Sequence, residues 1–211
     1  LTAQFTPDSE QWEPSVSEPV LVEVAAAEST TSLRLSRSLA SYGTVATATV
    51  TVEAEGAAPS GEVEIHSRDA VVATGTLEVD GHRGTAEVEL PAGLPAGSHR
   101  LTAVYPGSAE VEGSSSRAVR YTVLPALPRM SIATGPDRTV QVAVQGRAGA
   151  PTPTGSVAVT AGLRVVGRAE LDENGIAEVR LPRLWTRTVV IAAYSGDHGY
   201  LPGVTARVVS P

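Results

Sequence analysis

Leu101-Thr-Ala-Val-Tyr105-Pro-Gly-Ser108 is the stretch that decides the fold, because its pattern occurs three times in 211 residues. It recurs as Val190-Ile-Ala-Ala-Tyr194-Ser-Gly-Asp197 and, at the start of the sequence, as Leu1-Thr-Ala-Gln-Phe5-Thr-Pro-Asp8. Each copy is an apolar strand that ends on an aromatic residue and runs into a turn. Self-similarity at spacings of 100 and then 89 residues predicts an array of modules.

Two further segments repeat in the same order and at nearly the same spacing. They are Pro59-Ser-Gly-Glu-Val-Glu-Ile65 with Pro153-Thr-Gly-Ser-Val-Ala-Val159, and Gly84-Thr-Ala-Glu-Val-Glu-Leu-Pro91 with Gly175-Ile-Ala-Glu-Val-Arg-Leu-Pro182. We therefore expect one complete module over residues 30–124 and a second over residues 129–211. Residues 1–24 match only the C-terminal hairpin of a module, so we interpret them as the end of a preceding one.

Apolar and polar residues alternate within each module, which is the period of a strand with one buried face. The strands expected in the first module are residues 32–37, 44–52, 62–66, 71–79, 85–90, 98–105 and 118–123. No segment has helical periodicity, and Pro and Gly punctuate the chain about every 10 residues, as short antiparallel strands require. About seven strands in each module predict an all-β chain of tandem immunoglobulin-like antiparallel β-sandwiches.

The alternation also predicts which residues form the cores. Phe5, Tyr105 and Tyr194 are expected at equivalent core positions, and Trp12, Val111 and Tyr200 at equivalent positions past the turn. The last strand is expected to turn Ala206 and Val208 inward, and the second strand of the N-terminal hairpin to use Val20, Val22 and Val24 as its apolar face. A lone hairpin is marginal in water, so residues 1–24 belong either to a longer array or to a sandwich completed in another subunit.

The repeated segments also resemble a known family. Thr31-Ser-Leu-Arg-Leu-Ser36, the Pro-x-Gly-x-Val and Gly-x-Ala-x-Val-x-Leu-Pro segments, and Pro95-Ala-Gly-Ser-His-Arg-Leu-Thr-Ala-Val-Tyr105 are similar to the bacterial Ig-like repeat domains of secreted and surface proteins. Ala193-Tyr-Ser-Gly-Asp-His-Gly-Tyr200 resembles that family's last turn. The resemblance covers nearly the whole chain and implies a structural or adhesive module outside the cell or on its surface. It implies no catalytic or ligand-binding residue, because the shared positions belong to the core and the turns.

Composition limits the chemistry that the chain can support. There is no cysteine, so neither a disulfide nor a cysteine zinc site can form. All sixteen basic residues are Arg, a bias typical of GC-rich bacterial genomes, and with the resemblance this implies an actinobacterial-type source. No stretch approaches about 18 apolar residues and no signal peptide opens the sequence, so we expect a processed or excised segment without membrane insertion.

Motif searches give no catalytic, cofactor-binding or metal site, and we expect no enzyme. The four histidines, His66, His82, His99 and His198, have no metal-ligand spacing, and no Gly-x-Ser-x-Gly elbow is present. Asp172-Glu-Asn-Gly175 is interpreted as a hairpin turn, with an oxygen-rich calcium loop as the alternative.

Charge and one tryptophan give the only candidates for binding. Residues 1–125 have a net charge of -10 and residues 126–211 one of +3. This asymmetry reflects either plain solubility or a basic module that contacts an anionic cell-wall polymer such as teichoic acid. The contacts would be Arg164, Arg168, Arg180, Arg183 and Arg187. No binding motif for nucleic acid appears.

Trp185 stands in the expected corner loop Leu184-Trp-Thr-Arg187, and two roles are open for it. Its ring could pack against a sheet end or a neighbouring module, or it could anchor a ligand together with Arg183 and Arg187.

The functional expectation is a non-catalytic extracellular spacer or building block of a surface or filamentous repeat protein. Its partners would be neighbouring Ig-like modules of the same or another subunit, with a cell-wall polymer or surface protein as a further partner. The alternatives are an adhesin-type module that recognises a protein or glycan, and an ancillary domain of a secreted hydrolase.

Overall fold

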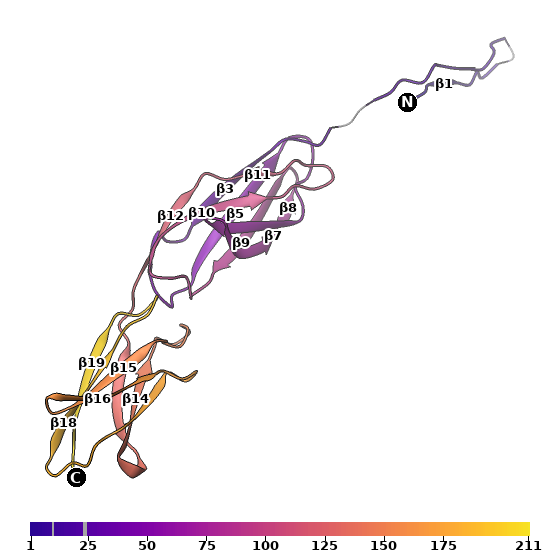
Figure 1. The fold of residues 1–211 in the computed structure, drawn as a ribbon. Helices are drawn as coiled ribbons and strands as arrows, with labels where there is room; N and C mark the ends of the chain where they lie inside the picture. The colour runs from indigo at the N-terminus through magenta and orange to yellow at the C-terminus, as the bar shows by residue number, and fades with distance from the viewer. Residues whose placement is uncertain (10, 23–24) are drawn as a thin grey trace.

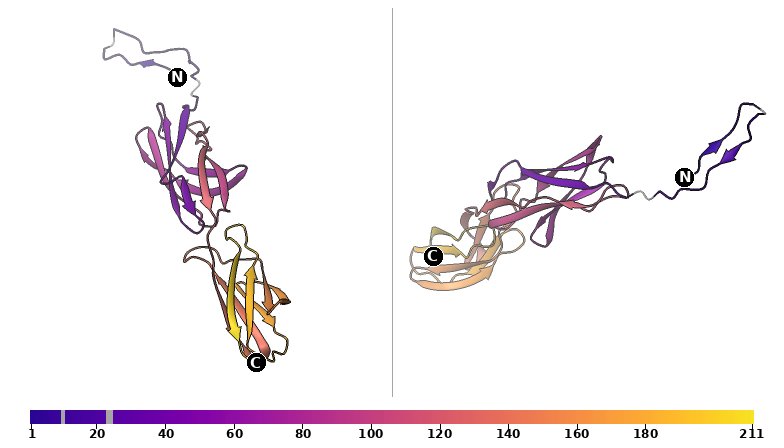
Figure 2. Two further views of the ribbon diagram at one scale, coloured as in Figure 1. Left: turned by 90° about the vertical axis from the view of Figure 1, so that its left-hand side faces the viewer. Right: turned by 90° about the horizontal axis from the view of Figure 1, so that it is seen from above.

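Two β-sandwiches follow one another along the chain in the computed structural model, which describes residues 1–9, 11–22 and 25–211. Figures 1 and 2 show them end to end, with the C-terminus at the far end of the second. Within the described residues the chain is strand and turn, apart from one 3-10 turn at Pro136–Arg138. None of those residues belongs to a helix long and apolar enough to cross a membrane.

The first sandwich packs a sheet in the order β3-β5-β9-β8 against one in the order β4-β12-β10-β6-β7, with the short β11 beside β10. The strands are β3 (Ser29–Leu35), β4 (Leu39–Ser41), β5 (Ala46–Ala54), β6 (Glu62–Ser67), β7 (Ala70–Thr76), β8 (Glu78–Asp80), β9 (Arg83–Leu90), β10 (Gly97–Tyr105), β11 (Ser114–Ser115) and β12 (Val119–Leu124). Neighbours pair antiparallel except β4 and β12, which are parallel.

The second sandwich packs the sheet β13-β14-β17 against the sheet β16-β15-β18-β19. The strands are β13 (Arg129–Thr134), β14 (Thr139–Gln145), β15 (Ser156–Ala161), β16 (Arg164–Glu170), β17 (Ile176–Arg180), β18 (Thr188–Tyr194) and β19 (Gly203–Val209). Residues 36–45, which connect β3 to β5, contain β4, whereas only residues 135–138 connect β13 to β14. Residues 129–211 are all described, and they contain no counterpart of β4.

The predicted all-β tandem Ig-like architecture is confirmed. Nearly all the residues predicted to face inward in the two sandwiches are buried. Every second residue is buried along β5, where these residues are alanine or valine, and along β14, where they are valine. β10 and β18 each end on a buried tyrosine, Tyr105 and Tyr194. Buried side chains of both sandwiches form one connected cluster, so the apolar core continues from one sandwich into the next.

The expected single strand over residues 71–79 is wrong, because the chain changes sheets there. β7 pairs with β6 in one sheet, and β8 pairs with β9 in the other. Leu77, which lies between them, is buried, and its N–H donates to the carbonyl of Gly61 at 2.9 Å. The buried leucine fixes the point at which the chain crosses from one layer to the other.

The expected inward positions of the last strand are also wrong. β19 pairs with β18 so that Arg207 lies opposite the buried Val190. Thr205, Arg207 and Val209 therefore share the inner side, while Ala206 and Val208 are exposed on the outer side. The strand carries small apolar residues on both sides, so hydrophobicity alone does not set its phase.

The N-terminal hairpin consists of β1 (Gln4–Phe5) and β2 (Ser15–Val16), paired antiparallel. Its large apolar side chains are exposed. They include Phe5, which was expected at a core position, and Trp12, whose equivalents Val111 and Tyr200 are buried. Val20 and Val22 are exposed as well, and Val24 of the same predicted face lies outside the described residues. Within the described residues, β1 and β2 form a two-stranded sheet of their own that joins neither sandwich.

Candidate functional site

Trp185 and Arg183 lie together at the distal end of the second sandwich, in the loop between β17 and β18. The Arg183 guanidinium carbon lies 4.4 Å from the centroid of the Trp185 ring, which is a cation–π geometry. Trp185 is 77% exposed, so its ring does not pack against the sheet end or the first sandwich.

These two side chains border an open groove of about 690 Å³. The β13–β14 turn, the β17–β18 loop and the end of β19 form its walls. Its lining residues are Thr134, Gly135, Arg138, Thr139, Val140, Leu181, Pro182, Arg183, Leu184, Trp185, Arg207, Val208, Val209, Ser210 and Pro211. Three arginines and no Asp or Glu are among them, although Asp137 adjoins Arg138 on the turn. The groove therefore suits a ligand that carries negative charge.

Of the arginines that the sequence singled out, the structure brings only Arg183 into this groove. Arg187 is exposed in the same loop but does not line it. Arg138 and Arg207 do line it and were missed. Arg207 connects the two sheets of the second sandwich, because its Nη1 on β19 donates to the carbonyl of Ile132 on β13 at 2.8 Å. Arg207 was missed because Ala206 and Val208 were expected to face inward, which would place Arg207 on the outer side of β19.

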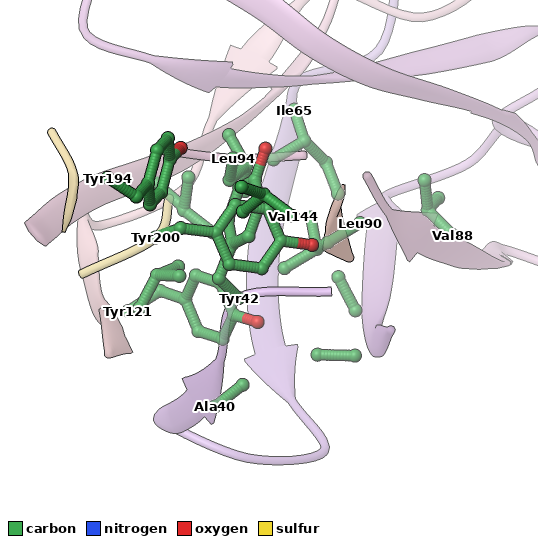
Figure 3. Close-up of a cluster of buried hydrophobic side chains, with 14 of the residues drawn as sticks. Ala40, Tyr42, Ile65, Val88, Leu90, Leu94, Tyr121, Val144, Tyr194 and Tyr200 are labelled. Atoms are coloured by element: carbon green, nitrogen blue, oxygen red, sulfur yellow. The ribbon is translucent and has the colours of Figure 1, made fainter. Parts of the chain in front are cut away.

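A second candidate site is the junction between the two sandwiches. Tyr42, directly after β4, is 1% exposed and packs edge-on against Tyr200, with 5.1 Å between ring centroids. Its ring also lies edge-on to His198, and its hydroxyl is 3.2 Å from His198 Nε2. Figure 3 shows Tyr42 and Tyr200 side by side in a cluster of buried side chains that includes Leu94 of the first sandwich and Val144 of the second.

Backbone hydrogen bonds hold the same junction. The N–H of Ala126 in the linker donates to the carbonyl of Gly199, and the N–H of Leu201 donates back to the carbonyl of Ala126, each at 2.9 Å. The N–H of Ala96 donates to the carbonyl of His198 at 2.8 Å. The linker and one loop of the first sandwich are thus bonded to the loop that follows β18.

The residues before the first sandwich repeat this arrangement. The N–H of Ala27 donates to the carbonyl of Glu110, and the N–H of Glu112 donates to the carbonyl of Ala27, each at 2.8 Å. By this bonding Glu110 is the equivalent of Gly199, because each accepts the linker alanine N–H. Each sandwich therefore makes the same pair of backbone hydrogen bonds to the linker that precedes it.

Glycine is needed at position 199 because the two sandwiches meet there. A Cβ on Gly199 would lie 2.3 Å from Cε1 and Cζ of Tyr42. The equivalent position in the first sandwich is glutamate, so the loop conformation itself accepts a side chain. The contact with Tyr42, and not the backbone, explains the glycine.

Asp197 organises the loop that the second sandwich brings to the junction. Its Oδ1 accepts the N–H groups of Gly199 and Tyr200, each at 2.7 Å, and its Oδ2 accepts the N–H of Thr154 at 2.9 Å. Burial pushes the pKa of Asp197 upward, but these backbone donors outweigh it and hold that pKa below its ordinary value. The pKa of the Tyr194 phenol is raised, first by burial and then by the charge of Asp197.

The remaining chemical candidates have structural partners. Asp172 Oδ1 accepts the N–H groups of Asn174 and Ile176 at 2.9 and 2.8 Å, and Gly175 has a φ of 74°, so this segment forms the predicted hairpin turn. His66 Nε2 lies 2.8 Å from Glu64 Oε2. In the part of the chain that the structure describes, no three His, Asp or Glu side chains gather in a group that could hold a metal ion.

Comparison with known proteins agrees with the repeated pattern. The family model of the bacterial Ig-like domain (group 3) matches residues 33–124 and again residues 127–210. None of the curated proteins matches the chain.

Among solved structures, the adhesin InvE of Yersinia pseudotuberculosis is 13% identical over 84% of this chain and 58% of its own, with a TM-score of 0.45. Domains 3–5 of the extracellular part of Drosophila OTK are 14% identical over 84% of this chain and 65% of theirs, with a TM-score of 0.33. Domains d3-d4 of the rat CD45 extracellular region are 15% identical over 44% and 56%, with a TM-score of 0.30. The chain spans less than two thirds of each of these structures, and similarity at this level carries no argument about function.

Proposed function

The chain belongs to the bacterial Ig-like domain family (group 3), and from this premise we propose that it is a non-catalytic spacer, a stiff segment of an extracellular or surface repeat protein. We divide it into modules at residues 30–124 and 129–211, preceded by the C-terminal hairpin of another module at residues 1–24. Its immediate partners are then neighbouring modules of the same kind.

The junction is the observation that carries this proposal. Two modules on a free linker would pivot independently. Here the buried Tyr42–Tyr200 pair supports one fixed orientation, as do the three backbone hydrogen bonds made by Ala96, Ala126 and Leu201. Each of these contacts contributes about 1 kcal/mol. Together they favour a single relative orientation of the two sandwiches, which a spacer requires.

A distance measurement between spin labels tests the spacer directly, because the chain has no cysteine of its own. Glu87→Cys and Glu178→Cys place one label on each sandwich at equivalent exposed positions beside the buried pair Ala86 and Ala177. We expect one narrow distance distribution by double electron–electron resonance. A broad distribution, of the width given by a flexible tether, would contradict the spacer.

Adhesin-type binding is the second candidate, and the groove at the distal end favours it. Three arginines and an exposed indole together suit an anionic polymer such as teichoic acid. In a chain that also carries Trp12→Phe, addition of polyglycerol phosphate should change the fluorescence of Trp185. Arg183→Ala should weaken this response several-fold, whereas Arg187→Ala, outside the lining, should not. An unchanged response in Arg183→Ala would remove this candidate.

A further inference from the structure

In the second sandwich, the outer face of the sheet β16-β15-β18-β19 is apolar and exposed. Adjacent strands β18 and β19 present Val189, Ile191 and Ala193 beside Val208, Ala206 and Val204, paired in that order. Four valines on or beside this face are largely exposed: Val165 (63%), Val189 (46%), Val204 (70%) and Val208 (52%). Val165 pairs with Thr160, which pairs with Ile191, so it lies on the same side of the sheet. We refer to these four valines, together with Ile191, Ala193 and Ala206, as the valine face.

The equivalent face of the first sandwich is charged, so an apolar outer face is not a requirement of the fold. Leu101 and Val190 occupy the same place in the repeat, which makes Arg100 the counterpart of Val189. Arg100 pairs with Arg120 across β10 and β12, just as Val189 pairs with Val208 across β18 and β19. Arg100 and Arg120 of the first sandwich therefore correspond to Val189 and Val208 of the second.

The next strand of the same sheet shows the same replacement. Val104 pairs with Glu64, and its counterpart Ala193 pairs with Ala158. Thr102 pairs with His66, and Ile191 pairs with Thr160. The ion-pairing side chains Glu64 and His66 of the first sandwich thus correspond to Ala158 and Thr160 in the second. Arg168, which pairs with Ala158, is a charged residue at the border of the face.

We propose that the valine face pairs with the same face of a second copy of this chain, and the aliphatic composition and the exposed area of the surface point to that occupant. The face has no aromatic platform for a sugar and no lysine for a phospholipid headgroup, whereas one aliphatic sheet face packs well against another. The outer faces of the other three sheets carry charged side chains, such as Arg34 and Glu87 on β3 and β9 and Glu178 on β17. Among the outer faces of the two sandwiches, the valine face is therefore its own best match, and self-pairing gives a closed two-fold dimer.

The exposed area is sufficient for a weak dimer. At about 150 Å² for a fully exposed valine, the four valines present roughly 350 Å², which is within the size range of functional patches. Two copies with their alanines and isoleucine would bury about 1,000 Å², the lower limit for a specific interface. We therefore expect a dimer dissociation constant of about 0.1–1 mM, with the two chains side by side. This inference is independent of the spacer proposal, because it does not involve the junction.

The first sandwich supplies the variant for the test. Val189→Arg with Val208→Arg copies Arg100 and Arg120, which the same fold already accommodates at the equivalent pair. Ser131→Arg with Ala133→Arg is the matched control, because it adds the same charge to the outer side of β13 on the opposite sheet. Sedimentation equilibrium of the full chain should show the wild type and the control approaching twice the monomer mass, and the valine-face variant dimerising at least tenfold more weakly.

Either of two sedimentation results would overturn the inference. One is a wild type that stays monomeric at 1 mM, which would leave the face to a different partner. The other is a valine-face variant that associates as the wild type does, which would assign association elsewhere, for example to the exposed N-terminal hairpin. A measurement without variants covers the case of a misfolded variant: amide NMR shifts should change with concentration in β18 and β19 and not in β13 or β14. The reverse pattern would also overturn the inference.

Discussion

Gly199→Ala should loosen the junction without unfolding either sandwich. The added Cβ would lie 2.3 Å from two ring atoms of Tyr42, where carbon atoms normally stay beyond about 3.4 Å. Tyr42 is buried, so its ring cannot swing into solvent to make room. Overpacking of this kind costs about 1–3 kcal/mol.

That cost is comparable with the energy that holds the junction together. The Tyr42–Tyr200 edge-on pair contributes about 0.5–1.5 kcal/mol, and each backbone hydrogen bond of the linker contributes about 1 kcal/mol. We therefore expect a substantial fraction of Gly199→Ala molecules to adopt other relative orientations. The label pair on Glu87→Cys and Glu178→Cys should report this as a broadened distance distribution, while circular dichroism stays that of the wild type.

A double-mutant cycle separates the contact from the loop. Tyr42→Ala removes the ring that the new methyl group would meet, so Gly199→Ala should add less than about 0.5 kcal/mol in that background. The equivalent residue, Glu110, already shows that a side chain is compatible with the loop. If Gly199→Ala is equally destabilising with and without Tyr42, or if the distance distribution of the single variant does not change, our explanation of the glycine is refuted.

Three further substitutions, with Leu163→Ala as a control, test the packing and the charge of the sandwiches. Leu101→Ala, at a fully buried position, should lower the free energy of unfolding by about 2–5 kcal/mol in urea titrations, whereas Leu163→Ala, at a fully exposed tip, should change it by less than about 0.5 kcal/mol. Gly75→Ala places a Cβ 2.5 Å from Cγ2 of Val88 and should cost about 1–3 kcal/mol in the same assay; no loss would show that β7 moves aside freely. Asp197→Ala should cost about 1.5–3 kcal/mol at neutral pH, because the carboxylate accepts several N–H groups. Because the pKa of Asp197 is lowered in the folded state, its stabilisation is complete above the ordinary value of 3.8 and is lost as the pH falls through the folded value. Thermal unfolding of wild type and variant should therefore converge in acid, and a difference that persists at low pH would contradict the assignment.

Repetition made most of the fold predictable from the sequence. Where a strand ends on a tyrosine before a turn, as β10 and β18 do, the aromatic residue fixes which side faces inward, and the predicted phase is confirmed. β19 has no such marker, because Gly203-Val-Thr-Ala-Arg-Val-Val209 has aliphatic residues on both sides. Its phase is set by pairing with β18, which a single strand's hydrophobicity does not encode.

The candidate sites were less accessible to sequence reasoning. The groove combines Arg138, Arg183 and Arg207, which come from three separate elements and meet only because the β13–β14 turn, the β17–β18 loop and the end of β19 lie at one edge of the sandwich. The junction depends on Tyr42, which follows a three-residue strand too short to give a periodic signal. Trp185 and Arg183 were identifiable because they share one loop.

The parallel pairing of β4 with β12 has a mechanical consequence. A pull on the two ends of the first sandwich would load Leu39–Ser41 against the end of β12 in shear, so that their hydrogen bonds must break together. The second sandwich has no such strand, and between β13 and β19 it has the single hydrogen bond from Arg207 to Ile132. Under tension the second sandwich should therefore yield at the lower force and lengthen first, so that it protects the first sandwich from sudden loads.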